Sequence, residues 1–248
     1  MKFTFALSFM LLSSLAPPKS FKTQQMSYER VKKAYAEKAT IVQQLFADQK
    51  LSLQSSEIFL RAFKAEKQLE LWAKPKGKPT GWQLVKTYPV CSASGVAGPK
   101  RRQGDLQVPE GFYTVNRWNP QSNFLLSLGV DYLNDSDRQL SDRKQPGGDI
   151  FIQGNCVSIG CLAMTDPAIQ EIYVAFVEAA NAGQTRVPVH LFPARLAGAS
   201  WERLQAQCLD DAVLAAFWRN LKTGHDWFEE KNALPRVGVD AKGGYVFR

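Results

Sequence analysis

Histidine and cysteine are both scarce in this chain of 248 residues, which contains two histidines and four cysteines. Four cysteines are too few for a small disulfide-dense scaffold, and their positions do not match a zinc-ligand spacing. Apolar residues make up 45% of the sequence and charged residues 22%, a balance that excludes intrinsic disorder and collagen-like repeats. The length predicts one large domain or a domain with appendages.

Long apolar runs are missing except for one at the start of the chain, which excludes a multi-span membrane protein. That run extends from Phe3 to Ala16, after Met1-Lys2 and before Pro17-Pro18-Lys19-Ser20. It is shorter than the roughly 20 residues that cross a bilayer, and its flanks are typical of a secretory signal. We expect a signal peptide over residues 1–20 and an exported protein of the periplasm or cell envelope, without an integral membrane span. Retention of the run as an anchor and a buried N-terminal helix are the alternatives.

The net charge of +8 comes from 31 Lys and Arg residues against 23 Asp and Glu residues. Because the basic residues are spread along the chain and no groove-reading motif is present, we do not expect a nucleic acid as a partner. An anionic wall or membrane surface is the more natural partner of an exported basic protein.

Three segments show the pattern of helices. Residues 28–47 carry apolar side chains at helical spacing, which predicts an amphipathic helix. A second helix is expected to begin at Asp166 as its cap, with Pro167 in the first helical position, and to end at Gly183. A third helix is expected over residues 210–221.

Alternation of apolar and polar residues predicts strands through most of the middle of the chain. The pattern over residues 57–73 indicates a β-hairpin that turns at Ala65-Glu66-Lys67. A second hairpin, with its turn at Lys242-Gly243-Gly244, is expected in the tail over residues 237–247. The sequence therefore predicts an α+β fold with a β-rich body, an N-terminal helix, and a C-terminal helix plus hairpin. The further strands expected lie at residues 82–90, 111–117, 124–128, 150–153 and 187–192.

The most unusual stretch runs from Gly147 to Asp166, where an apolar strand leads into a glycine-bearing loop that ends at a cysteine. The strand ends at Gln153-Gly154, and the loop continues through Ser158-Ile159-Gly160-Cys161. Glycines on both sides of a nucleophile let a substrate come close to the backbone, and free N–H groups near Cys161 are able to stabilise an oxyanion. The alternative is a tight turn that holds two half-buried cysteines.

The stretch from Ser158 to Asp166 resembles the active-site signature of the YkuD-type L,D-transpeptidases, in the branch of the YafK-like murein proteins. Other motifs similar to that branch follow in the same order, so the resemblance covers residue 58 to the C-terminus. These motifs are Gly98-Pro99-Lys100-Arg101-Arg102-Gln103-Gly104-Asp105, Pro109-Glu110-Gly111-Phe112-Tyr113, Phe192-Pro193-Ala194-Arg195 and Asp226-Trp227-Phe228-Glu229.

The resemblance implies a catalytic domain that acts on peptidoglycan stem peptides outside the cytoplasm, without a metal or an organic cofactor. It implies that Cys161 is the nucleophile, which forms an acyl thioester and passes the acyl group to an amine or to water. The backbone of Gly160 and Cys161 would help to hold the oxyanion. The expected domains are a YkuD-type domain at residues 56–196, a helical segment at 21–55 and an extension at 197–248. A wall-linked protein is a second expected class of partner.

Two positions depart from the family pattern. Gln153 stands at the strand end where the family has a histidine, and Ile159 stands where the wider family has a second one. Glutamine donates and accepts hydrogen bonds but cannot take a proton, so the usual base is missing. The alternatives to an active enzyme are a catalytically impaired protein that binds peptidoglycan and a wall-associated scaffold. The candidate catalytic residues are Cys161, Gln153, Gly160, Ser158 and Gly154.

The two histidines stand outside the catalytic positions of the family. His190 alternates with Val189 and Leu191, which predicts an orienting or solvent-facing strand residue. A role as the missing base is the alternative for His190. His225 precedes Asp226 in a stretch that indicates a polar turn, where a surface or capping role is expected.

Four basic residues are candidates to bind the carboxylates of a stem peptide through charge-assisted hydrogen bonds. A solvated basic loop is the alternative for three of them, and a structural ion pair is the alternative for Arg195. The polar segment with Asp137-Arg138 and Asp142-Arg143 is expected to border the cleft. The four candidates are Lys100, Arg101, Arg102 and Arg195.

The remaining cysteines have no role in the motifs. A buried thiol is the default expectation for Cys91 and Cys208. Cys156 is able to pair with Cys161 in an oxidising compartment, which would block the nucleophile, although spacing alone does not establish the required geometry.

Overall fold

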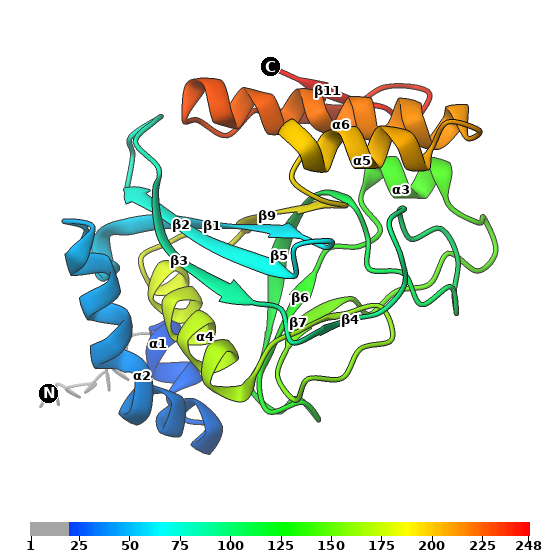
Figure 1. Cartoon of the computed structure of the whole chain (residues 1–248). Coiled ribbons are helices and arrows are strands. Elements are labelled where there is room, and N and C mark those ends of the chain that lie inside the picture. The colour runs from blue at the N-terminus through cyan, green and yellow to red at the C-terminus, as the bar shows by residue number, and fades with distance from the viewer. Residues whose placement is uncertain (1–19) are drawn as a thin grey trace, which may run out of the picture.

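The computed structural model describes residues 20–248, and Figure 1 traces them from the N-terminal helices to the C-terminal hairpin. The expected signal peptide lies outside the described residues, except for Ser20. Over the described range, no helix combines the length and the apolar character needed to cross a bilayer.

A nine-stranded mixed sheet forms the centre of the fold, with the strand order β3-β2-β1-β9-β5-β6-β7-β8-β4. β1 pairs in parallel with β9 and β7 pairs in parallel with β8, whereas the other neighbours are antiparallel. The strands are β1 (Ser56–Phe63), β2 (Gln68–Pro75), β3 (Gln83–Pro89), β4 (Ser92–Ala93), β5 (Gly111–Asn119), β6 (Ser127–Val130), β7 (Phe151–Gln153), β8 (Leu162–Ala163) and β9 (Val187–Phe192).

Helices cover both faces of this sheet (Figure 1). α4 and α2 share one hydrophobic core with the sheet, and α5 and α6 share another core with its opposite face. A separate two-stranded hairpin, β10 (Val237–Val239) with β11 (Tyr245–Phe247), lies next to α6. The helices are α1 (Phe21–Gln25), α2 (Glu29–Asp48), the 3₁₀ turn η1 (Leu53–Ser55), α3 (Asp135–Leu140), α4 (Asp166–Asn181), α5 (Gly198–Gln207) and α6 (Ala212–Lys231).

The central position of β1 follows from its side chains. Successive residues of a strand point to opposite faces. Ile58 and Leu60 therefore enter the core on the α4 side, while Phe63 packs on the other side with the Trp218 ring of α6. Burial on both faces removes the apolar surface of this strand from water, which is the main source of its stabilisation.

The α+β class and both hairpins predicted from the sequence are confirmed. The cap of α4 was predicted wrongly: Thr165 is the N-cap, because its hydroxyl accepts from the Ala168 N–H at 3.4 Å, and Asp166 is already helical. The predicted third helix is α6, which is longer than expected and reaches Lys231. The sequence did not predict α5, in which only Leu204 is buried, so that its apolar pattern is weak.

Both histidines are buried, which corrects the expectation that they face solvent or cap a turn. His190 lies between aromatic rings of the sheet, with the Phe112 ring centroid at 4.7 Å and the Phe59 centroid at 5.2 Å. His225 is part of α6, and its Nδ1 lies 3.1 Å from an oxygen of Asp226. Burial is the main cause that lowers the pKa of His190 to about 3, and the charge of Arg61 acts in the same direction.

The lowered pKa of His190 predicts a loss of stability in acid. The unfolded chain binds a proton at this residue below its ordinary pKa of 6.5, whereas the folded chain does not until about pH 3. The free energy of unfolding should therefore fall by about 1.4 kcal/mol for each pH unit below 6.5 through this residue alone. His190→Phe should remove this contribution to the acid-dependent loss of unfolding free energy, as measured by urea unfolding between about pH 8 and pH 4.5. The comparison at pH 8, where the ring is neutral in both states, isolates the packing effect. An acid slope that is identical in both proteins would contradict the assignment.

Candidate active site

Cys161 lies at the end of the loop that joins β7 to β8, and its thiol is free. The residue is 8% exposed and lines a cavity of about 630 Å³. Lys100 and Ile159 also line this cavity, together with the segment of residues 144–150 that leads into β7. The sulfur thus borders a space of the size that accepts small molecules and side chains.

Ser158 holds the turn that carries Cys161. Its hydroxyl donates to the Cys161 carbonyl oxygen at 2.7 Å and accepts from the Gly160 N–H at 3.2 Å. The Ser94 N–H also donates to this hydroxyl, at 3.3 Å, which ties the turn to the end of β4. Ser158 does not line the cavity, so its contacts position the backbone of the turn and do not face a ligand.

Two backbone positions in this loop require glycine. Gly160 has a φ of +128°, a conformation that residues with a side chain rarely adopt. A Cβ atom at Gly154 would lie 2.7 Å from Oδ1 of Asp166 and 2.8 Å from the Phe124 carbonyl oxygen. Backbone conformation therefore explains the glycine at position 160, and close packing explains the one at position 154.

A disulfide between Cys91 and Cys156 fixes the middle of the loop. It joins residues that are 65 positions apart and connects the loop to the chain between β3 and β4. The expectation of a buried thiol at Cys91 and the option of a Cys156 to Cys161 bridge are both wrong, because Cys156 has a different partner. Cys208 is a buried free thiol, as expected.

The surroundings of Cys161 favour a protonated thiol. Its Sγ donates to the Asp149 carbonyl oxygen at 3.8 Å. Burial is the largest influence and raises the pKa of the thiol, and the Asp149 carboxylate acts in the same direction. A hydrogen bond from the Phe151 backbone and the charge of Lys100 oppose this shift without cancelling it.

Gln153, at the position where a base would be expected, is buried and turned to the loop. It is 3% exposed, and its Nε2 donates to the Val157 carbonyl oxygen at 3.1 Å. Neither His190 nor His225 is among the residues that line the Cys161 cavity. Between residues 20 and 248, no group of three or more His, Cys, Asp or Glu side chains is arranged to hold a metal ion.

Only one of the four basic candidates lines the cavity. The Nζ of Lys100 is held at 2.6 Å from Oδ1 of Asp105 and at 2.9 Å from the Arg102 carbonyl oxygen. Arg101 turns away, since its Nη1 donates to Asp137 at 3.0 Å. Arg102 is exposed and does not line the cavity.

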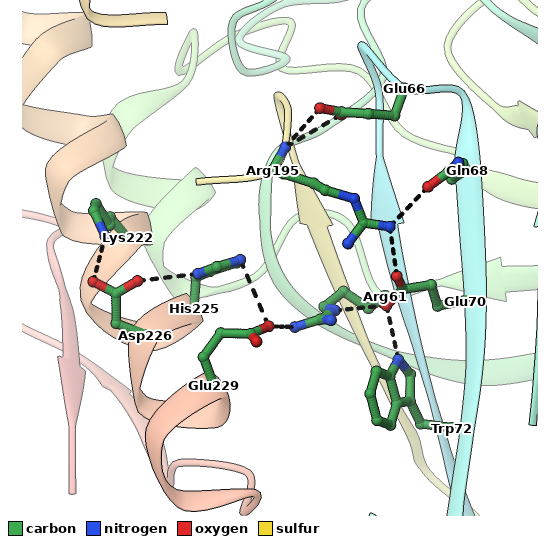
Figure 2. A network of polar contacts seen from close by, with 10 residues as sticks. All are labelled: Arg61, Glu66, Gln68, Glu70, Trp72, Arg195, Lys222, His225, Asp226 and Glu229. Carbon is green, nitrogen blue, oxygen red and sulfur yellow. Dashed lines mark hydrogen bonds and ion pairs between the residues drawn. The ribbon is translucent and has the colours of Figure 1, made fainter. Parts of the chain in front are cut away.

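Arg195 belongs to a different polar network, which Figure 2 shows. Its Nη2 donates to Glu70 at 2.8 Å and to Gln68 at 2.7 Å, and its backbone N–H donates to Glu66. Glu70 in turn accepts from the buried Arg61 at 2.9 Å. Arg195 therefore forms a structural ion pair, which is the alternative to binding a stem peptide, and it does not line the Cys161 cavity.

The polar segment before β7 divides into two parts. Asp137 does not border the cleft, because it is buried in a capping box with Asn134 at the start of α3. Burial raises the pKa of Asp137 to about 6, although the Tyr113 hydroxyl and Arg101 both donate to it. Arg138, Asp142 and Arg143 do not line the Cys161 cavity either, so the prediction is wrong for all four residues, whereas the residues that follow, from Lys144 to Ile150, do line it.

Lys144 and Asp149 are cavity residues that the sequence did not identify. Asp149 is a non-glycine residue with a φ of +53°, and its carbonyl oxygen is the acceptor for the Cys161 thiol. Its only sequence signal is its place just before the strand that leads to the cysteine. The contact depends on the path of the loop and not on a motif.

The raised thiol pKa predicts slow modification of Cys161 near neutral pH. Because the thiolate is the reactive form, alkylation by iodoacetamide should keep accelerating above the ordinary thiol pKa of 9.0. Lys100→Met removes a positive charge that favours the thiolate and should slow alkylation several-fold. Peptide mass spectrometry separates the label on Cys161 from that on Cys208. Lys242→Met, in the exposed turn of the C-terminal hairpin, is the matched control and should change nothing. A rate that reaches its plateau well below pH 9 would show that burial does not control the thiol.

Comparisons with known proteins show which family this chain is similar to. A sequence model of the L,D-transpeptidase catalytic domain, YkuD, matches residues 61–189. YafK of Escherichia coli, whose name marks it as a candidate L,D-transpeptidase, is 37% identical over 199 residues, which cover 79% of this chain and 76% of YafK. The crystal structure of the helical cell shape determining protein Pgp2 from Campylobacter jejuni is 17% identical, with a TM-score of 0.45 over 75% of this chain and 73% of Pgp2. On the strength of the sequence matches, this chain belongs to the family of YkuD L,D-transpeptidase catalytic domains.

Proposed function

We propose that this protein is an exported enzyme that acts on peptidoglycan stem peptides through an acyl thioester on Cys161. The family acts on such peptides. The observation that carries the proposal is a free thiol that lines a cavity on the loop between β7 and β8. The Cys91–Cys156 disulfide supports export, because disulfides persist mainly in oxidising compartments.

The proposed reaction uses the cysteine in two steps. The Cys161 thiolate attacks a stem-peptide carbonyl, the amide bond breaks, and the leaving amine takes a proton. An amine or water then attacks the thioester carbonyl and gives up a proton to solvent, and the C–S bond breaks, which returns the sulfur as thiolate. In the structure the Gly160 N–H already donates to Ser158, so the Cys161 N–H is the proposed donor to the oxyanion.

One lysine of the cavity is a candidate to bind a carboxylate of the substrate. Lys144 lines the space next to Cys161, whereas Lys100, which also lines it, is already paired with Asp105 at 2.6 Å. A lysine ammonium pairs with carboxylates by charge-assisted hydrogen bonds, which are about twice as strong as neutral ones. The proposed role of Lys144 is therefore to hold a carboxylate of the stem peptide while the carbonyl reaches the sulfur.

A second candidate function is binding of stem peptides without turnover. The observations that favour it are the raised pKa of the Cys161 thiol and the amide, in place of an imidazole, at Gln153. A buried thiol that stays protonated is a weak nucleophile. The two functions share the cavity but differ in whether a covalent intermediate forms.

Purified muropeptides distinguish these functions. The protein should form an acyl adduct on Cys161, visible by intact mass spectrometry, and release a cleaved or exchanged product with a rate that rises with pH. Cys161→Ser should abolish both the adduct and the product. Cys208→Ser removes the other free thiol and should leave turnover unchanged. Saturable binding without adduct or product would establish the binding function, and the absence of binding would overturn both proposals.

Placing a histidine at position 153 tests whether the missing imidazole limits the rate of the proposed reaction. Gln153→His places a titratable group at the end of β7, where the family has its histidine, and should raise turnover by at least about tenfold near pH 7. The rate of Cys161 alkylation between about pH 5 and pH 9 should rise with it. Gln153→Asn, which shortens the side chain without adding a base, is the control. If Gln153→His changes neither quantity, residue 153 does not act on the thiol.

A further inference from the structure

Lys64 and Glu110 form an ion pair inside the protein. Lys64 directly follows β1, and Glu110 directly precedes β5. The Lys64 Nζ lies 2.9 Å from Oε1 of Glu110, and the two side chains are 7% and 0% exposed. The second carboxylate oxygen accepts from Nε1 of Trp218 on α6 at 2.9 Å. Neither partner of the pair lines the Cys161 cavity. Because burial removes the hydration of both charges, such a pair requires further hydrogen bonds.

The further hydrogen bonds of this pair reach both ends of one segment, residues 98–108. The Lys64 Nζ donates to the Gly98 carbonyl oxygen at 2.9 Å and to the Val108 carbonyl oxygen at 3.0 Å. The Gly98 N–H donates to Oε1 of Glu110 at 2.7 Å. With Glu110, the two carbonyl oxygens use all three donors of the ammonium group. The pair therefore holds together the place where the segment begins and the place where it ends.

Segment 98–108 forms one wall of the Cys161 cavity. The neighbouring wall is the segment 144–150, and a backbone hydrogen bond joins the two, since the Gln103 N–H donates to the Gln145 carbonyl oxygen at 2.7 Å. The shape of the cavity therefore depends on where segment 98–108 lies. Its lining residues are Lys100, Gln103, Gly104 and Leu106.

The same segment lies against the turn that carries the sulfur. A Cβ atom at Gly160 would lie 3.3 Å from the Gln107 carbonyl oxygen, so the two backbones are close. Ser94, whose N–H holds this turn, also donates through its hydroxyl to the Leu106 carbonyl oxygen at 2.7 Å. Movement of the segment would therefore change the cover over Cys161 as well as the cavity.

Regular secondary structure does not hold this wall in place. Residues 98–110 are all described, and none of them belongs to a helix or a strand. The middle of the segment turns around Asp105, whose carboxylate accepts from the Arg101 N–H at 2.8 Å. The two ends depend on Lys64 and Glu110. Without those end contacts, the wall has no strand ladder to keep it in position.

We propose that Lys64 and Glu110 are positioning residues for the chemistry at Cys161. By holding both ends of segment 98–108, they fix one wall of the cavity and keep the sulfur covered. Since neither residue lines the cavity, both act through the segment. Their effect on a substrate rests on the proposed function, whereas their effect on the thiol does not.

Selective alkylation of Cys161 in the full chain tests this role. Lys64→Met removes the ammonium group and should accelerate alkylation by iodoacetamide at least about fivefold at about pH 8, because the thiol loses part of its cover. Peptide mass spectrometry follows Cys208, the other free thiol, in the same sample. Cys208 is 5% exposed and should change by less than about twofold, whereas general loosening of the fold would expose both thiols.

Lys74→Met is the matched control variant. Lys74 is buried as well, and it pairs with Glu57 on the same β-hairpin, at the end away from the turn. Its substitution removes a comparable ion pair without a contact to segment 98–108. Neither thiol should react faster in this variant.

A neutral variant covers the case in which Lys64→Met does not fold, since that variant leaves the Glu110 carboxylate buried without its partner. The double variant Lys64→Met/Glu110→Gln carries no unpaired charge there, yet it lacks the lysine hydrogen bonds to both ends of the segment. Cooperative urea unfolding establishes that it is folded. It should show the same selective acceleration at Cys161.

Hydrogen exchange tests the pair without any substitution. The Gly98 N–H, which donates to Glu110, should exchange at least about 100-fold more slowly than the N–H of the exposed Gly104. This comparison is made within one segment, so it reports on the end that the pair holds against the middle that it does not.

Muropeptide kinetics connect the pair to the proposed function. Lys64→Met should raise KM by about fivefold and change kcat by less than about twofold, because the segment lines the cavity but does not carry the sulfur. Absence of product from the unsubstituted protein would overturn the proposed function alone, since the alkylation and exchange experiments require no turnover.

Three results would overturn the assignment of these positioning residues. They are unchanged alkylation of Cys161 in both variants, equal acceleration of Cys161 and Cys208, and a Gly98 N–H that exchanges as fast as that of Gly104. In an active protein, a fall in kcat at unchanged KM would also contradict it, because the wall would then not act on the bound substrate.

Discussion

Burial of the Cys161 thiol is the constraint on which the chemistry of this site depends. The same packing that places the sulfur at the cavity also raises its pKa, and the Asp149 carbonyl oxygen accepts a hydrogen bond that only the protonated form donates. Two neighbours lower the pKa of the thiol, namely the Phe151 backbone and the Lys100 ammonium. Since neither His190 nor His225 lines the cavity, ionisation of the thiol depends on those neighbours and on the solution pH.

The two imidazoles instead take part in the packing between the sheet and α6. His225 lies near Asp226 and Glu229, and Glu229 is also the partner of the buried Arg61 (Figure 2). His190 sits among aromatic rings on the same side of the sheet. Burial lowers the pKa of both rings, so this side of the sheet holds neutral imidazoles that serve packing and not proton transfer to the thiol.

Periodicity predicted the parts of the fold that are governed by local burial. The hairpin that turns at Ala65-Glu66-Lys67 and the helix α4 were predicted from the sequence. Alternating apolar residues, and apolar residues at helical spacing, indicate directly which face of a strand or helix packs against the core. Family resemblance singled out Cys161 and Gly160 as candidate site residues. It did not reveal that Arg195 pairs with Glu70 or that Cys91 is the partner of Cys156, because both contacts join segments that are far apart in the chain. Neither pattern nor motif carries information on such pairings.

The Cys91–Cys156 bridge has a topological consequence. It closes a covalent ring that contains Lys100, the segment 144–150 and Gln153, and therefore most of the wall around the sulfur. A single proteolytic cut anywhere within that ring leaves both new ends tethered to the same molecule. A chain nicked there would keep its cavity wall attached for as long as the bridge stays oxidised.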